Sequence, residues 1–156
     1  MICRIALLLF AVCIAVSAQS KYTGPRPPKP DLPYLKHASN LVPTESGMAR
    51  EEKKKDDITY IVEGATSTAR TPLASPILLV EVDKLAIDRL GLYKMESKNG
   101  RREVLATPKK PPKMFRIEID KLADKLYKIE VGDSLEAGEY SLSAEGSNQV
   151  FCFQVY

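Results

Sequence analysis

Apolar residues recur at every second position in the C-terminal third of the chain. The pattern occupies four stretches: 114–119, 126–131, 140–144 and 149–155. In the first stretch, Phe115, Ile117 and Ile119 share one face, while Arg116 and Glu118 lie on the other. A period of two is typical of half-buried antiparallel strands, because successive side chains point to opposite faces. We therefore expect four strands here, each with one face toward a core.

The earlier part of the chain carries shorter strand patterns. Segments 34–38 and 40–45 predict edge strands, the second because Pro43 cannot donate to a ladder. Residues 58–64 are rich in β-branched and aromatic side chains, and the continuous apolar run 77–82 predicts a central strand. The Asn99–Gly100 pair between two strand patterns is a strong hairpin signal, since both residues accept a positive φ.

These elements together predict an all-β fold. About seven to nine short strands, frequent turn signals and no long helical pattern favour an antiparallel Greek-key β-sandwich covering residues 34–156. The Asp-Lys-Leu-Ala sequence occurs twice, at 83–86 and 120–123, each time after a strand pattern. We expect both copies to form a short turn or helical connector, and either duplication or convergence could explain them.

The segment 135–140 carries a more specific resemblance. Its Leu-Glu-Ala-Gly-Glu-Tyr sequence resembles the tyrosine corner of immunoglobulin-like and fibronectin type III sandwiches. The resemblance implies that Leu135, Gly138 and Tyr140 form a structural corner, with the Tyr140 hydroxyl bonded to nearby backbone. The sequence of nearly the whole mature chain is similar to uncharacterised secreted bacterial proteins. This resemblance implies no particular activity.

The N-terminus predicts export. Arg4 precedes an apolar run from Ile5 to Val16, and small residues at 16–18 favour cleavage after Ala18. The run is too short to span a bilayer, which takes about 20 residues, so we expect no transmembrane segment after cleavage. A lipoprotein signal ending at Cys13 is the alternative. Residues 19–33 are proline-rich and predict an extended linker or a plain flexible tail.

The charge balance and the cysteine count of the mature chain exclude some classes of function. Removal of residues 1–18 takes away one of 23 basic residues and none of 20 acidic ones, which leaves the mature chain close to neutral. This balance disfavours nucleic acid as a partner. Only Cys152 of three cysteines remains after cleavage, so no internal disulfide can form. Cys152 is expected to be a packed, inert thiol rather than a partner in an intermolecular disulfide.

Catalytic and metal patterns are weak in this sequence. His37 is the single histidine, and no nucleophile-elbow, zinc-type or phosphate-loop spacing accompanies it. Carboxylate pairs occur at 56/57, 83/88 and 120/124, as a hydrolase or a calcium site would need, but solvated turns explain them equally well. We therefore expect no catalytic residue, no metal and no cofactor.

The remaining candidate surface is basic. Five side chains, from a hairpin and a proline-rich loop, could together bind an anionic partner: Arg101, Arg102, Lys109, Lys110 and Lys113. The hypothesis is an exported, non-catalytic binding or interaction module, periplasmic, envelope-associated or extracellular, whose partner is a protein or an anionic envelope component. The alternatives are a structural subunit that assembles through edge strands and a carboxylate-dependent hydrolase.

Overall fold

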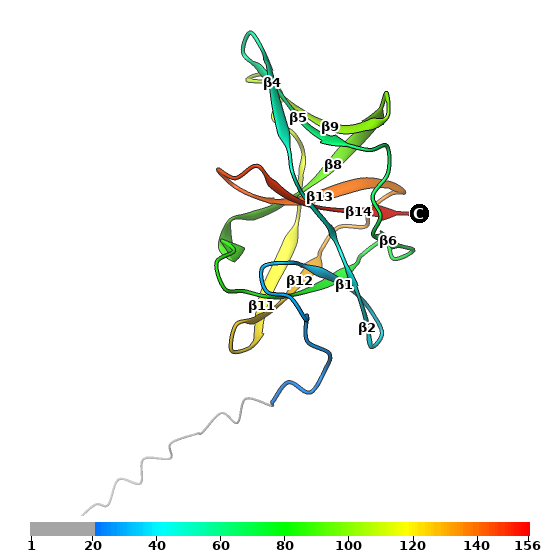
Figure 1. Ribbon diagram of the computed structural model, residues 1–156, viewed down its shortest axis with the longest axis vertical. Coiled ribbons are helices and arrows are strands. Elements are labelled where there is room, and N and C mark those ends of the chain that lie inside the picture. The colour runs from blue at the N-terminus through cyan, green and yellow to red at the C-terminus, as the bar shows by residue number, and fades with distance from the viewer. Residues whose placement is uncertain (1–20) are drawn as a thin grey trace, which may run out of the picture.

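The computed structural model describes residues 21–156, and the predicted signal peptide at 1–18 lies outside this range. The described chain is an all-β sandwich of two sheets, which confirms the predicted fold class, although it has more strands than the predicted seven to nine (Figure 1). The strands are β1 (Tyr34–His37), β2 (Asn40–Pro43), β3 (Glu45–Met48), β4 (Arg50–Lys54), β5 (Asp57–Glu63), β6 (Arg70–Thr71), β7 (Ile77–Glu81), β8 (Leu90–Lys98), β9 (Arg101–Ala106), β10 (Met114–Phe115), β11 (Ile117–Ala123), β12 (Leu126–Val131), β13 (Gly138–Ala144) and β14 (Gln149–Val155). One short 3-10 helix, η1 (Ile87–Arg89), precedes β8.

The two sheets differ in the number and order of their strands. The smaller sheet has the order β11-β12-β7-β1-β2, and the larger has the order β3-β14-β13-β8-β9-β5-β4. The short strands β10 and β6 add to β8 and β14, and only β6 pairs in parallel. In Figure 1 the smaller sheet lies at the bottom, β13 and β14 cross the middle, and β4, β5 and β9 form an upper tier.

The main core lies between the smaller sheet and one face of β8, β13 and β14. Its largest fully buried apolar side chains are Leu35, Leu78, Leu92, Ile129, Tyr140, Leu142, Phe151 and Phe153. The alternation predicted for 140–144 and 149–155 supplies half of this set, and β7 supplies the central strand expected from its apolar run. The Asn99–Gly100 hairpin also forms, with both residues at positive φ, between β8 and β9.

The predicted corner has the expected hydrogen bond. The Tyr140 hydroxyl donates to the Glu136 carbonyl oxygen over 2.9 Å, while the ring packs edge-on against Phe115 and stacks on Phe153. Leu135 is buried beside it, and its N–H donates to the carbonyl of Ala74. The corner therefore anchors the start of β13 in the main core.

Tyr140→Phe tests this corner, because it removes the hydroxyl and keeps the ring. We expect the free energy of unfolding to fall by about 1 kcal/mol, the net value of one hydrogen bond. Urea denaturation monitored by circular dichroism gives the difference. An unfolding midpoint identical to that of the wild-type protein would show that the hydrogen bond contributes nothing.

Four expectations need correction. Residues 114–119 do not form one strand: the chain crosses from the larger sheet to the smaller at Arg116, whose N–H donates to the carboxylate of Asp133. The first strand, β1, is not an edge, because it pairs with β2 on one side and β7 on the other. The second Asp-Lys-Leu-Ala copy lies within β11, whereas the first forms a turn before η1, so the two copies have different structures. The sandwich also does not start at residue 34.

The proline-rich segment packs against the sandwich from Pro25 onward. Asp31 is the anchor: its carboxylate accepts hydrogen bonds from the backbone N–H groups of Asp83, Lys84 and Leu85 at 2.8 to 3.0 Å. Partial burial acts to raise the pKa of Asp31, but these donors outweigh it and lower the pKa. Arg26 adds an ion pair with Glu81. Most of the predicted linker is therefore part of the folded unit.

The larger sheet curls so strongly that its two edge strands are neighbours in the sequence. Its edge strands β3 and β4 are consecutive, joined only by Ala49, whose N–H donates to the carbonyl of Asn148 in the β13–β14 turn. One bent segment, 45–54, thus pairs with β14 at its start and with β5 at its end. The curl brings β4, β5 and β9 over the face of β13 and β14 that points away from the main core.

Candidate functional site

The curled sheet encloses a second, smaller interior. Register places Cys152 beside Ser141 and Glu45, and Val62 beside Arg102, so these alternate residues share the inward face. The apolar members form a separate cluster made of Ala49, Val62, Met95, Val150 and Cys152, with Tyr60 and Val104 packed on it. This interior is polar at one end and open at the other.

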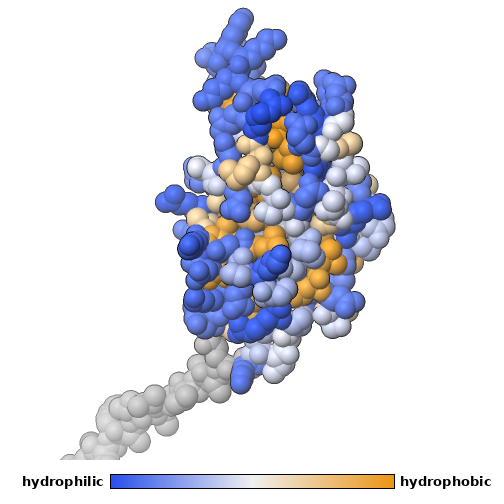
Figure 2. All heavy atoms as spheres, viewed as in Figure 1, coloured by the Kyte–Doolittle hydropathy of each residue, from blue (hydrophilic) through white to orange (hydrophobic). Residues whose placement is uncertain are grey.

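The open end is a cavity of about 340 Å³, which we call the cup. Its apolar walls come from the bent segment and from β5, β8, β9 and β14: Ala49, Tyr60, Val62, Met95, Val104 and Val150. Its rim is polar and is formed by Glu51, Tyr93, Ser143, Glu145, Asn148 and Pro112, among others. Figure 2 shows apolar side chains among polar ones in the upper part of this face, below the hydrophilic tip of the molecule.

Tyr93 reaches the rim because the residue two positions before it is glycine. A Cβ added at Gly91 would lie 2.8 Å from the Tyr93 hydroxyl oxygen and 2.9 Å from a ring carbon, closer than real Cβ atoms come to other heavy atoms. Gly91 therefore lets the Tyr93 ring lie along the strand. The β13–β14 turn, residues 145–148, forms the adjoining part of the rim.

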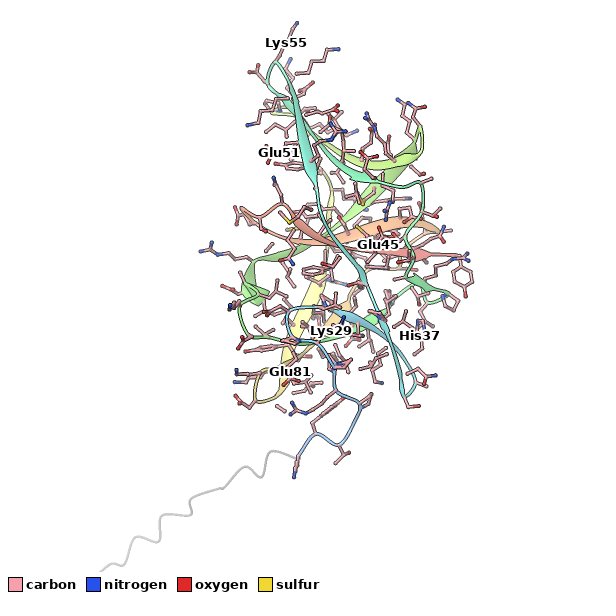
Figure 3. All side chains as sticks on the ribbon, in the orientation of Figure 1. Lys29, His37, Glu45, Glu51, Lys55 and Glu81 are labelled. Carbon is pink, nitrogen blue, oxygen red and sulfur yellow. The ribbon has the colours of Figure 1, made fainter. Side chains whose placement is uncertain are left out.

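The closed end of the interior is plugged by Arg102, whose side chain is 1% exposed. Its guanidinium donates to the Glu45 carboxylate at 2.5 Å and to the carbonyl oxygens of Glu63 and Gly64 at 2.8 and 2.9 Å. It also donates to the Ser67 hydroxyl at 2.6 Å. Figure 3 shows Glu45 and Glu51 at two levels of the bent segment, the first at the plug and the second nearer the hairpin tip. The segment thus contributes to both ends of the interior.

Glu139 completes the plug. Its Oε2 accepts from the Ser67 N–H and hydroxyl at 3.0 and 2.6 Å, and lies 3.9 Å from the Arg102 guanidinium. The other carboxylate oxygen, Oε1, is the one buried side-chain nitrogen or oxygen in residues 21–156 without a hydrogen-bond partner. Two carboxylates therefore depend on a single guanidinium for their neutralisation. Partial burial of Glu45 acts to raise its pKa, but the hydrogen bond from Arg102 and those from Thr68 outweigh it and lower the pKa.

Cys152 lies close to the plug and is fully buried. Burial raises the pKa of its thiol to about 12; nearby Arg102 opposes this effect, and Glu45 and Glu139 add to it. A thiol with this pKa stays protonated at neutral pH and is a poor nucleophile. This position agrees with the packed thiol predicted from the sequence. The residues that cover Cys152 belong to the curled sheet.

The structure does not bring the five predicted basic residues together. Arg102 was expected on the surface, but it points into the curled sheet, where two carboxylates neutralise it. Arg101 begins β9, whereas Lys109 lies beyond its last residue, Ala106, which is about 16 Å from Arg101 along the strand at ~3.3 Å per residue. Arg101 is also paired with Glu103 and Glu52. The five residues therefore do not form one surface patch, because Arg102 is buried.

Two of the predicted lysines do border a second surface hollow. Lys110 and Lys113 line it together with Lys94 and Lys98, while Lys109 is exposed beside it. Three carboxylates, Glu96, Glu103 and Glu136, line the same hollow, and Lys94 is paired with Glu136 at 3.0 Å. The mixed charge leaves only a weak attraction for an anion.

The carboxylate pairs and His37 lie away from the cup lining. Asp56 and Asp57 lie at the exposed β4–β5 turn, and the other two pairs belong to the connectors and strands around the smaller sheet. His37 is on β1, where Nε2 lies 3.0 Å from the Thr71 hydroxyl. Within residues 21–156 no group of three metal-type side chains comes together, and no helix is long and apolar enough to cross a membrane.

The cup itself was missed in the sequence, although a signal for it is present. Val150 and Cys152 alternate with Phe151 and Phe153, so both faces of β14 are apolar and both need a cover. The polar character of Ser141 concealed this, because a serine on a strand indicates an outward face, whereas Ser141 is buried under the curled sheet. Comparisons of the chain with models of protein families, with curated proteins and with solved structures found no match.

Proposed function

We propose that the protein is an exported, non-catalytic binding module, and that the cup holds the apolar part of a small ligand. The observation that carries the proposal is the cup itself, a preformed cavity of about 340 Å³ with apolar walls and a polar rim. Ligand pockets of folded proteins have this composition and are of roughly 300–1,000 Å³. Export rests on the signal-like sequence at residues 1–18.

The chemistry around the cup supports binding rather than catalysis. The Arg102 guanidinium is engaged by Glu45, Glu139, Ser67 and two backbone carbonyls, so it is held as a structural plug. The Cys152 thiol has a raised pKa and lacks the basic, exposed setting of a reactive cysteine. Neither group is part of the cup lining, so the apolar walls remain available to a ligand.

Assembly through edge strands is the alternative. The smaller sheet has two edges, β11 and β2, and the second contains Pro43, which blunts strand addition. The larger sheet joins its own ends through Ala49, which makes β3 and β4 poor templates for another chain. Sedimentation of the mature protein distinguishes the two proposals, because strand addition requires oligomers that dissociate on dilution.

A neutral fluorescent probe, N-phenyl-1-naphthylamine, tests ligand binding. We expect saturable binding with a rise in emission, and at least a tenfold loss of affinity in Val104→Trp, because the indole fills the cup. Leu105→Trp is the matched control, since Leu105 is the next residue of β9 and is 54% exposed. It should bind the probe within about twofold of the wild-type protein.

Thermal unfolding of both variants checks that each is folded. An absence of saturable binding by the wild-type protein would contradict the proposal. So would an equal loss of affinity in the two tryptophan variants, because it would place the probe in the second hollow, which both residues line. The wild-type chain contains no tryptophan, so the indole emission of each variant also reports on its own surroundings.

A further inference from the structure

We infer that the cup selects amphipathic ligands with a cationic head group, such as an alkylammonium ion. The inference rests on the proposed function, and it adds the charge of the ligand. An apolar body would lie between Val62, Met95 and Val104, and the ammonium would remain at the rim. The acidic residues of the lining, its two tyrosine rings and the neutralised charge of Arg102 each support this ligand class.

The charged residues that line the cup are both acidic. Glu51 and Glu145 belong to the lining, and no lysine or arginine does. Glu145 takes part in no ion pair within residues 21–156, and Glu51 has one long contact, 3.7 Å, with the exposed Lys53. Exposed pairs of this kind contribute little. A cation at the rim therefore meets two carboxylates, whereas an anion meets repulsion.

Two tyrosines in the cup lining favour the same ligand. Tyr60 and Tyr93 both line the cavity, and ammonium groups are attracted to the faces of aromatic rings. The Ser143 hydroxyl and the Asn148 side chain add dipoles that can accept from a protonated amine. The rim thus offers both kinds of contact that an ammonium head group uses.

The floor offers no counter-charge to an anionic head. The positive charge of Arg102 lies at the plug end of the interior, where Glu45 and Glu139 already neutralise it. Lys110 and Lys113 line the neighbouring hollow, and Val104 and Pro112 contribute to both hollows. These lysines are the one feature that could attract an anion to the mouth, so the experiment must compare both signs.

The size of the cup limits the apolar body. A volume of about 340 Å³ would hold about 11 waters at ~30 Å³ each. An alkyl chain of about ten carbons fills a similar space. Decyltrimethylammonium and decyl sulfate therefore make a suitable pair of probes, with the same tail and opposite charge.

Each decyl probe is titrated, below its micelle concentration, against the protein loaded with N-phenyl-1-naphthylamine. We expect the cationic probe to displace the dye at about tenfold lower concentration than the anionic one, with a preference that shrinks as salt is added. Glu51→Gln/Glu145→Gln should reduce the preference to about twofold or less. Glu118→Gln/Asp124→Asn, which removes the same charge from exposed positions around the smaller sheet, should leave it unchanged.

Equal displacement by the two probes, or better displacement by decyl sulfate, would overturn the inference. A preference that survives in the Glu51/Glu145 variant would overturn it as well, because the charge selection would then come from elsewhere. In each of these cases dye binding itself remains, so the proposed function stands. If the wild-type protein fails to bind the dye, the proposed function fails first, and the two failures are distinguishable.

Discussion

Replacing Arg102 with methionine is expected to lower the free energy of unfolding by about 3–5 kcal/mol. The methionine fills part of the volume of the arginine but carries no charge. Glu45 and Glu139 then face each other at the plug without the guanidinium that pairs with both. The Ser67 hydroxyl and the carbonyls of Glu63 and Gly64 also lose their donor. Urea unfolding of the purified variant measures the loss.

Arg101→Met is the matched control, because Arg101 is the preceding residue and makes only partly exposed ion pairs. It should lower the free energy of unfolding by less than about 1 kcal/mol. The triple variant Arg102→Met/Glu45→Gln/Glu139→Gln should recover part of the stability, since it removes the uncompensated charges. Equal stability of the Arg102→Met and wild-type proteins would contradict the role of the plug.

The second large effect is a loss of stability at high pH. The folded protein holds the Cys152 thiol at a pKa of about 12, whereas the ordinary value is 9.0. Between these values the folded chain keeps a proton that the unfolded chain has released. The stabilisation is therefore complete below pH 9 and decreases as the pH rises toward 12, by about 1.4 kcal/mol per pH unit at most.

Cys152→Ala isolates this contribution. The variant removes the thiol, so the slope of the unfolding free energy against pH between 9 and 12 should become shallower than in the wild-type protein. The comparison uses the slope, because the smaller side chain also changes the absolute stability. Burial similarly raises the pKa of Tyr140 and leaves some slope in the variant. Superimposable slopes would show that Cys152 ionises as freely in the folded protein as in the unfolded chain.

Local patterns in the sequence were sufficient to predict the fold class. The alternation in β13 and β14, the apolar run of β7 and the Asn99–Gly100 turn act through nearest neighbours, and the structure has all of them. The bond from the Tyr140 hydroxyl to Glu136 spans four residues and was expected from the resemblance to a tyrosine corner. Such patterns do not predict which distant strands pair with one another.

The cup and its plug depend on those distant pairings. Arg102 was assigned to the surface because it follows a hairpin turn in a charged sequence, yet its side chain faces inward with Val104 once β9 pairs with β5. The partners of Arg102, at positions 45, 67 and 139, are 35 to 57 residues away along the chain. The proline-rich segment was assigned to a linker, because the acceptor role of Asp31 requires backbone donors at 83–85. Charge composition identified neither contact.

Methionine methyl resonances test the central claim, that the cup is an open binding cavity, most directly. The described chain has three methionines: Met95 lines the cup, whereas Met48 and Met114 are 70% and 64% exposed. The protein labelled with ¹³C at these methyl groups is titrated with N-phenyl-1-naphthylamine. We predict that the Met95 resonance shifts and saturates with the ligand, while the Met48 resonance does not move. A shift at Met48 or Met114 with an unchanged Met95 would contradict the claim.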